Sequence, residues 1–129
     1  MTINDERVVA AVRAAFDRYE EALRVNDAST LGELFWRSER TVRYGMGGEI
    51  GHGWEEIQGH RKLRPAIAGP WRTLSDTVIT TFGDQFATVS TLFHRAEDPD
   101  MVGRQMQTWA LMPEGWRIVA AHVSWVSKR

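Results

Sequence analysis

The sequence predicts one α+β domain in which helices from the first half of the chain cover one face of a curved antiparallel sheet. Apolar residues recur at helical spacing over residues 8–23. Residues 71–124 instead contain successive strand-length runs that are rich in Thr, Val, Ile and Trp. The predicted order is helix, helix, short strand, helix, then four antiparallel strands. Such a cone leaves a cavity between its helices and its sheet.

The first helix is expected to begin after Asn4 or Asp5, whose short side chains can accept hydrogen bonds from the free amides of the first turn. One stripe faces inward as far as about Val25, and it comprises Val8, Val9, Val12, Ala15, Phe16, Tyr19, Ala22 and Leu23. The phenol of Tyr19 would be partly buried there and would need a partner. A core tyrosine bonded to a backbone carbonyl is the alternative to a functional role.

A short second helix, capped by Asp27 or Ser29, is expected to follow the break at Asn26-Asp27. Residues 41–45 then have the composition of a strand, and the glycine-rich residues 45–53 predict a turn or the end of a hairpin. If Val42 and Tyr44 pack outward, Arg43 points inward, where its charge requires an anion or several acceptors. A solvated arginine on an edge strand is the alternative.

A third helix is expected over residues 54–63, ended by Pro65. Trp54, Ile57, Arg61 and Arg64 fall near one face of this helix. Two guanidinium groups on one stripe suggest that its far end reaches the mouth of a cavity. The alternative is that both arginines extend into solvent along their apolar stems.

The closing hairpin, residues 103–124, depends on its turn. We expect Pro113-Glu114-Gly115 to form a three-residue loop, because a type I turn continued by a positive-φ residue favours proline first and glycine last. Met112 would then pair with Trp116. Side chains alternate between faces along a strand, so Gln107, Trp109, Val119, Ala121 and Val123 would share the inner face. The outer face would carry Met106, Thr108, Ala110, Ile118, Ala120, His122 and Ser124, with His122 in a subunit interface.

Composition limits the classes of function. Hydrophobic residues make up 43% of the 129 residues, charged residues 26%, and the net charge is -1, which disfavours disorder and disfavours nucleic acid or a membrane as a partner. Cysteine is absent, so disulfides and thiolate catalysis are excluded. The polar N-terminus contains no apolar signal core, and we expect a cytoplasmic protein.

Several familiar sites are missing from the sequence. It contains no P-loop, no dinucleotide fingerprint and no G-x-S-x-G motif, and its four histidines lack metal-ligand spacing. No metal or cofactor is expected. The remaining candidate pocket combines Tyr19, Arg43, Gln105 and Gln107, with Trp36, Trp71 or Trp109 as walls. Because a guanidinium matches a carboxylate with two parallel hydrogen bonds and also favours a tyrosinate, we expect a small, planar, anionic ligand and proton transfer by Tyr19.

Six segments form a combination of motifs: Phe16-Asp17-Arg18-Tyr19-Glu20, Leu34-Phe35-Trp36, Arg40-Thr41-Val42-Arg43, His60-Arg61-Lys62-Leu63-Arg64-Pro65, and residues 103–109 and 115–124. With these segments the chain resembles the AtzH-like (HpxZ-like) family of the nuclear transport factor 2-like, or SnoaL-like, superfamily. The resemblance spans nearly the whole chain. The chain departs from the family pattern at His60 and at Gly45-Met46-Gly47-Gly48.

The resemblance implies one cone-shaped α+β barrel domain over residues 1–129, dimeric or higher through the outer sheet face. It also implies nitrogen catabolism, near amidases of oxalurate or cyanuric acid breakdown, with hydrolysis of 1,3-dicarboxyurea to allophanate. Tyr19 and Arg43 correspond to the residues proposed to act, and Arg61 and Arg64 are candidates to help hold the substrate.

Two other functions stay open. One is a non-catalytic module that binds a small carboxylate or a partner amidase. The other is a ketosteroid-isomerase-like isomerase or cyclase, which requires an inward carboxylate such as Asp76.

Overall fold

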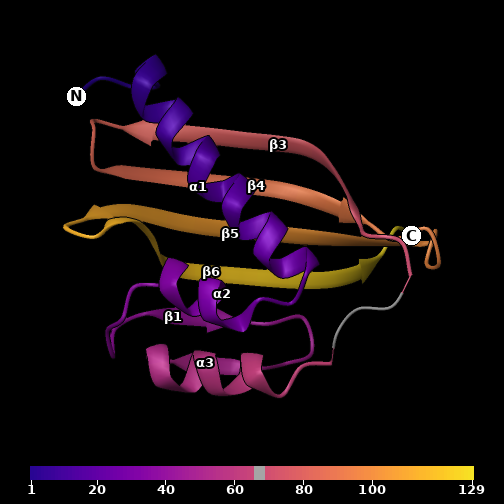
Figure 1. Ribbon diagram of the computed structural model, residues 1–129. Helices are drawn as coiled ribbons and strands as arrows, with labels where there is room; N and C mark the ends of the chain where they lie inside the picture. Colours follow the sequence, from indigo (N-terminus) through magenta and orange to yellow (C-terminus); the bar gives the residue numbers. More distant parts are fainter. Residues whose placement is uncertain (66–68) are drawn as a thin grey trace.

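A computed structural model of the chain, which describes residues 1–65 and 69–129, consists of three helices and six strands (Figure 1). They are α1 (Glu6–Arg24), α2 (Ala28–Leu34), β1 (Val42–Tyr44), β2 (Ile50–His52), α3 (Trp54–Lys62), β3 (Thr73–Phe82), β4 (Phe86–His94), β5 (Met101–Met112) and β6 (Gly115–Ser127). The predicted order of elements is confirmed. The structure also contains the short strand β2, which the predicted order did not include. It lies within the glycine-rich residues 45–53, which were predicted to form a turn or the end of a hairpin.

Local chemistry explains where the helices begin and end. Asp5 caps α1 by accepting from the amide of Arg7, and Asp27 caps α2 by accepting from the amide and the hydroxyl of Thr30. Asn26 separates the two helices in a left-handed conformation (φ 55°), which asparagine tolerates better than most residues. The predicted break at Asn26-Asp27 is therefore confirmed.

The sheet has the strand order β2-β1-β6-β5-β4-β3, and it is curved without closing into a barrel. Strands β3 to β6 pair antiparallel, as predicted. Strand β1 pairs antiparallel with β2 but parallel with β6, so the sheet is mixed rather than wholly antiparallel. This parallel pair places Arg43 opposite Ala121 and next to the centre of the sheet.

The predicted three-residue loop in the closing hairpin is wrong. Met112 pairs with Gly115, which leaves a two-residue turn of Pro113 and Glu114, and the positive φ of 125° falls on Gly115. The consequence is seen in the strands: Trp109 pairs with Ile118, which is fully buried, so the outward assignment of Ile118 and the inward assignment of Val119 are wrong as well.

A bulge in β6 restores the predicted faces further along the hairpin. The register shifts between Thr108 and Trp109, because Thr108 pairs with Ala120 and Val119 is the extra residue. Beyond the bulge, Gln107 pairs with Ala121 on the inner face, whereas Met106 pairs with an exposed His122 on the outer face. The outward position of His122 is confirmed, although the turn that predicted it is not.

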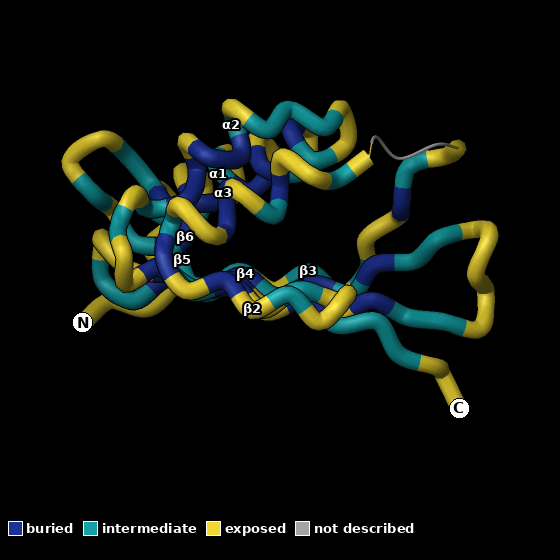
Figure 2. Tube along the Cα trace, turned by 90° about the horizontal axis from the view of Figure 1, so that it is seen from below, coloured by how far each residue is buried: buried dark blue, intermediate teal, exposed yellow. Residues whose placement is uncertain are grey.

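The helices cover one face of the sheet and leave the other without helices (Figure 2). The buried stripe of α1 packs with the inner residues of β4, β5 and β6, and this core includes Phe16, Phe35, Val89, Trp109 and Ile118. Burial of each such side chain contributes about 1.5–3 kcal/mol to folding. The inner face is therefore fixed by the core, and the cavity lies where that core ends.

One uncharged row crosses the opposite face of the sheet. It follows the strand pairing through Ile50, Tyr44, His122, Met106, Ser90 and Val78. Ile50 and Met106 are each 63% exposed and Val78 is 55% exposed. Among the described residues, no helix is long and apolar enough to cross a membrane.

Candidate functional site

A cavity of about 310 Å³ lies between the C-terminal part of α1 and the inner face of the sheet. Five of its polar lining residues come from five different segments: Tyr19 from α1, Arg43 from β1, Glu49 from the β1–β2 turn, Arg64 from the segment after α3, and Gln105 from β5. Trp71, Phe93 and Trp125 supply apolar walls. A mostly apolar hollow with a few convergent polar groups is the usual form of a small-molecule site.

Arg43 points into this cavity because its neighbours Val42 and Tyr44 occupy the outer face of β1. It lies in one row across the sheet with Gly51, Ala121 and Gln107, and the methyl side chain of Ala121 leaves room between Arg43 and Gln107. Arg43 is only 6% exposed. Burial lowers the pKa of its guanidinium, opposed by attraction to Tyr19 and Glu49, yet an arginine remains a cation at neutral pH.

Tyr19 is 2% exposed, and its ring lies 6.4 Å from the ring of Phe35. The guanidinium of Arg61 is stacked over the same Phe35 ring at 5.1 Å. Tyr19 and Arg61 are near neighbours without a hydrogen bond of standard geometry, and attraction to Tyr19 favours the charged form of Arg61. The charged neighbours of the phenol are therefore two arginines, Arg43 and Arg61.

Arg61 is 3% exposed, and within residues 1–65 and 69–129 none of its three guanidinium nitrogens has a hydrogen-bond partner. Burial lowers its pKa to about 10, and the nearby charges of Arg43 and Arg64 act in the same direction. An uncompensated buried cation is costly to folding. Beside Tyr19, this guanidinium can stabilise an anion or a developing negative charge.

Arg72 forms the opposite side of the cavity and is neutralised by the protein itself. It pairs with Glu20 of α1 and also donates to Gln105 Oε1 at 3.2 Å. The ring of Phe93 lies 4.3 Å below its guanidinium. The hydrogen bond from Arg72 orients the Gln105 amide. In the part of the chain that the structure describes, the buried Nε2 of Gln105 has no partner, so it can donate to a ligand.

The AtzH-like family model matches residues 1–129. The chain belongs to the AtzH-like family. A solved structure of a protein of unknown function from Pectobacterium atrosepticum is 56% identical, covers 97% of this chain and 95% of its own, and superposes with a TM-score of 0.91. A cystatin-like fold protein from Burkholderia xenovorans is 47% identical over 100% and 99% of the two chains, with a TM-score of 0.92.

More distant structures share the fold alone. A putative ketosteroid isomerase from Parabacteroides distasonis is 17% identical over 88% of this chain and 86% of its own, with a TM-score of 0.70. Together with nuclear transport factor 2-like proteins from other bacteria, it shows that this AtzH-like protein has the nuclear transport factor 2-like fold. The comparison with curated proteins gives no match.

The structure brings together five of the nine residues predicted for the site of this AtzH-like protein. Tyr19, Arg43, Arg64, Trp71 and Gln105 line one cavity. The other four, which are Trp36, Arg61, Gln107 and Trp109, lie outside its lining. Arg61 is next to Tyr19, as described above, so it reaches the site through that residue.

The remaining three residues have structural contacts. Trp109 is fully buried in the core, where its indole donates to Gln107 Oε1 at 3.0 Å. The main-chain amide of Trp36 donates to the carbonyl of Ile118 at 2.9 Å. The expected tryptophan walls are therefore supplied by Trp71, and by Trp125, which was not predicted.

Among the described residues that line the cavity, Glu49 is the one with a carboxylate. The sequence contained a signal for it. If β1 and β2 form a hairpin with Arg43 facing inward, alternation turns residues 49 and 51 inward as well. Asp76, the carboxylate that an isomerase would require, instead lies exposed at a bulge in β3 with φ 53°.

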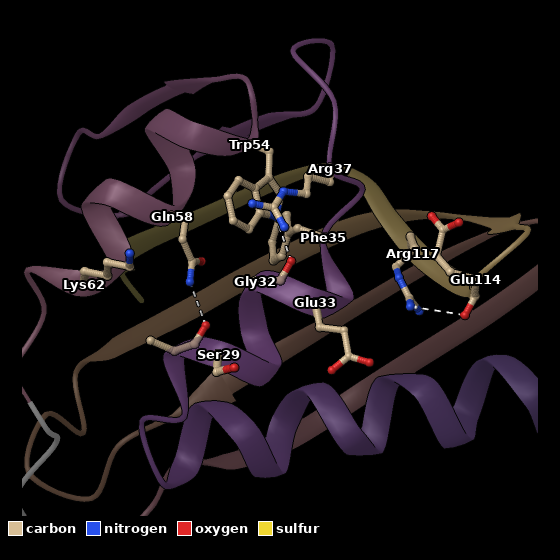
Figure 3. Close-up of a pocket in the computed structure, with 11 residues that line it drawn as sticks. Ser29, Gly32, Glu33, Phe35, Arg37, Trp54, Gln58, Lys62, Glu114 and Arg117 are labelled. Carbon is tan, nitrogen blue, oxygen red and sulfur yellow. Dashed lines mark hydrogen bonds between the residues drawn. The ribbon is translucent and has the colours of Figure 1, made fainter.

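A larger, open pocket of about 660 Å³ lies between α2, α3 and the tip of the closing hairpin (Figure 3). Three of its polar side chains bond to the protein itself: Gln58 donates to the carbonyl of Ala28 at 2.8 Å, Trp54 to that of Gly32 at 2.7 Å, and Arg117 to that of Glu114 at 3.1 Å. These bonds hold α2 against α3 and stabilise the hairpin tip. The smaller cavity is the better candidate for a ligand site, because Gln105 Nε2 in its wall is buried without a partner among the described residues.

Proposed function

We propose that this AtzH-like protein is a cofactor-free amidohydrolase of nitrogen catabolism that acts on a carboxylated urea such as 1,3-dicarboxyurea. The observation that carries the proposal is the convergence of Tyr19, Arg43, Arg64 and Gln105 on one cavity of about 310 Å³. Guanidinium groups bind carboxylates through paired hydrogen bonds. A cavity at the lower end of the usual range of about 300–1,000 Å³ suits a substrate of about ten non-hydrogen atoms.

The four converging residues and the neighbouring Arg61 each have a part in the proposed reaction. Arg43, helped by Arg64, binds a substrate carboxylate, while the unpartnered Nε2 of Gln105 donates to a substrate oxygen. Tyr19 delivers a proton to the nitrogen whose bond to carbon breaks, and the nearby Arg61 stabilises the resulting tyrosinate. In the balanced reaction, dicarboxyurea dianion and water yield allophanate and bicarbonate. Water returns the proton to Tyr19.

A second candidate is a module that binds a small carboxylate without turnover, for its own use or for a partner amidase. The observation in its favour is that none of the described residues that line the cavity is a Ser, Thr, Cys or Lys that could act as a nucleophile. The binding module uses the same Arg43 site. The two functions therefore differ in product formation rather than in ligand.

The deciding experiment follows freshly generated ¹³C-labelled dicarboxyurea by NMR with the wild-type protein and Arg43→Gln. An amidohydrolase produces bicarbonate and allophanate faster than the uncatalysed decay, and Arg43→Gln abolishes most of that acceleration. Arg40→Gln, at an exposed position three residues away, is the matched control. Thermal stabilisation by ureido acids without any acceleration would favour the binding module instead.

A further inference from the structure

The β1–β2 turn places a carboxylate of the protein at the arginine end of the cavity. Residues Gly45 to Glu49 form a closed turn, in which the amide of Gly45 donates to the carbonyl of Glu49 at 3.0 Å and that of Gly48 to the carbonyl of Gly45 at 3.1 Å. The Glu49 side chain folds back and accepts from the amide of Gly47 at 3.1 Å. The carboxylate is therefore held by the turn.

Glycines make this placement possible. A Cβ at Gly45 would collide with the Glu49 carboxylate and would lie 2.9 Å from Nη1 of Arg43, and a Cβ at Gly47 would lie 2.8 Å from Glu49 Oε1. Absence of side chains at these two positions leaves the space that the carboxylate occupies. The Glu49 carboxylate and the Arg43 guanidinium therefore both lie beside Gly45.

Glu49 is an anion with no ion pair of its own among the described residues. Hydrogen bonds from its own amide and from that of Gly47, together with the charges of Arg64 and Arg43, lower the pKa of its carboxyl group against the opposing effect of burial. It is consequently ionised at neutral pH. Arg43 and Arg64 attract it, but neither is within salt-bridge distance.

We infer that Glu49 is a specificity-determining residue, an internal carboxylate that competes with the carboxylate of a ligand for the Arg43–Arg64 end of the cavity. This inference rests on the proposed carboxylate site and identifies what limits its affinity. A ligand must bring its own negative charge close to Glu49, and the repulsion weakens binding. Small dicarboxylates that lack further contacts, such as the hydrogen bond to Gln105, are thereby disfavoured.

The test is the affinity for malonate, measured by titration calorimetry at low ionic strength. Glu49→Gln removes the charge and keeps the shape, and we expect it to bind malonate about threefold to tenfold more tightly than wild type, as for like charges several ångströms apart in a partly solvated site. The gain should shrink at about 0.5 M salt, where such charges are screened. Glu49→Asp keeps the charge and should stay closer to wild type than Glu49→Gln.

Glu56→Gln, on the exposed face of α3, changes the net charge equally and should leave the affinity unchanged. Equal or weaker binding by Glu49→Gln, absence of malonate binding in both proteins, or an equal gain in Glu56→Gln would each overturn the inference. If the proposed function is wrong, the experiments give a different result. In that case wild type forms no bicarbonate from dicarboxyurea, yet the malonate affinities still differ between Glu49→Gln and wild type.

Discussion

Among the single residues of the site, Arg61 differs from the others because the burial of its charge destabilises the folded protein. Its guanidinium is buried and has no acceptor among the described residues, although a buried charge without a partner is expensive. A residue kept only for folding would be apolar here. We therefore propose that Arg61, which lies outside the cavity lining, acts through its neighbour Tyr19. Its role is that of a positioning residue that stabilises negative charge on the Tyr19 oxygen.

Arg61→Met should raise the melting temperature and increase the free energy of unfolding by about 1–4 kcal/mol, since an apolar side chain of similar length replaces the buried charge. The same change should lower turnover, because the tyrosinate loses its stabilising cation. Lys62→Met, at the exposed neighbouring position, is the control. A destabilised Arg61→Met protein would show that the guanidinium has a structural partner.

The pKa of Arg61 gives this difference a pH dependence. Burial lowers its pKa to about 10, so the unfolded chain binds the proton more tightly than the folded one. The penalty is complete below pH 10 and is lost as pH rises from there toward the unfolded pKa. The stability gained by Arg61→Met, measured by urea unfolding, should therefore be constant from pH 7 to 9 and smaller at pH 11.

The sequence predicted the orientation of a side chain where the periodicity of a single strand or helix determines it. Arg43 faces inward because Val42 and Tyr44 face outward, and Tyr19 is buried because it falls on the apolar stripe of α1. Glu49 was missed because its inward position depends on the pairing of β1 with β2. The contact of Arg72 with Glu20 joins residues 52 apart in sequence, and no local pattern indicates it.

At the scale of elements, the Glu20–Arg72 ion pair fastens α1 to the start of β3. Their side chains are 12% and 4% exposed, respectively. Glu20→Leu leaves Arg72 buried without its counterion, so we expect a loss of about 3–5 kcal/mol in chemical unfolding. The double variant Glu20→Leu, Arg72→Met should recover most of that loss.

The control for the ion pair is the adjacent Glu21. It pairs with Arg24 at 2.6 Å, but the two side chains are exposed, and exposed pairs contribute little. Glu21→Leu should therefore leave the melting temperature nearly unchanged. Equal effects of Glu20→Leu and Glu21→Leu would contradict a structural role for the buried pair.

The closing hairpin shows why elements are easier to predict than their register. Its two strands were predicted from composition, but the turn type depended on which of Pro113, Glu114 and Gly115 joined the strands. The bulge at Val119 then compensated for the wrong turn. A bulge leaves little local signal, because its cause is the curvature of the whole sheet.

For the whole molecule, the order of elements was sufficient to predict helices on one face of a curved sheet. The parallel pairing of β1 with β6 was not predictable in the same way, because it joins segments about 80 residues apart in sequence. The cavity depends on the order of elements and on this parallel pair. The parallel pair positions Arg43, α1 positions Tyr19, and both residues line the cavity.

The uncharged row across the outer face predicts a homodimer formed through that face. Met106→Glu places a charge at a 63% exposed position in the row and should convert the dimer to a monomer, as measured by sedimentation velocity. Val25→Glu, at an exposed position at the end of α1, is the control and should remain dimeric. A monomeric wild type, or a dimeric Met106→Glu, would contradict this interface.

In the proposed function Tyr19 delivers a proton to a bound carboxylated urea, and the chain provides an internal control because it has two tyrosines. Tyr44 lies on the outer face, where its hydroxyl contacts His52 at 3.1 Å. The most direct measurement is kcat/KM for dicarboxyurea in Tyr19→Phe and Tyr44→Phe. We expect Tyr19→Phe to lower kcat/KM by about 10²-fold or more and Tyr44→Phe to leave it unchanged. Equal kcat/KM values in Tyr19→Phe and wild type would contradict proton delivery by Tyr19.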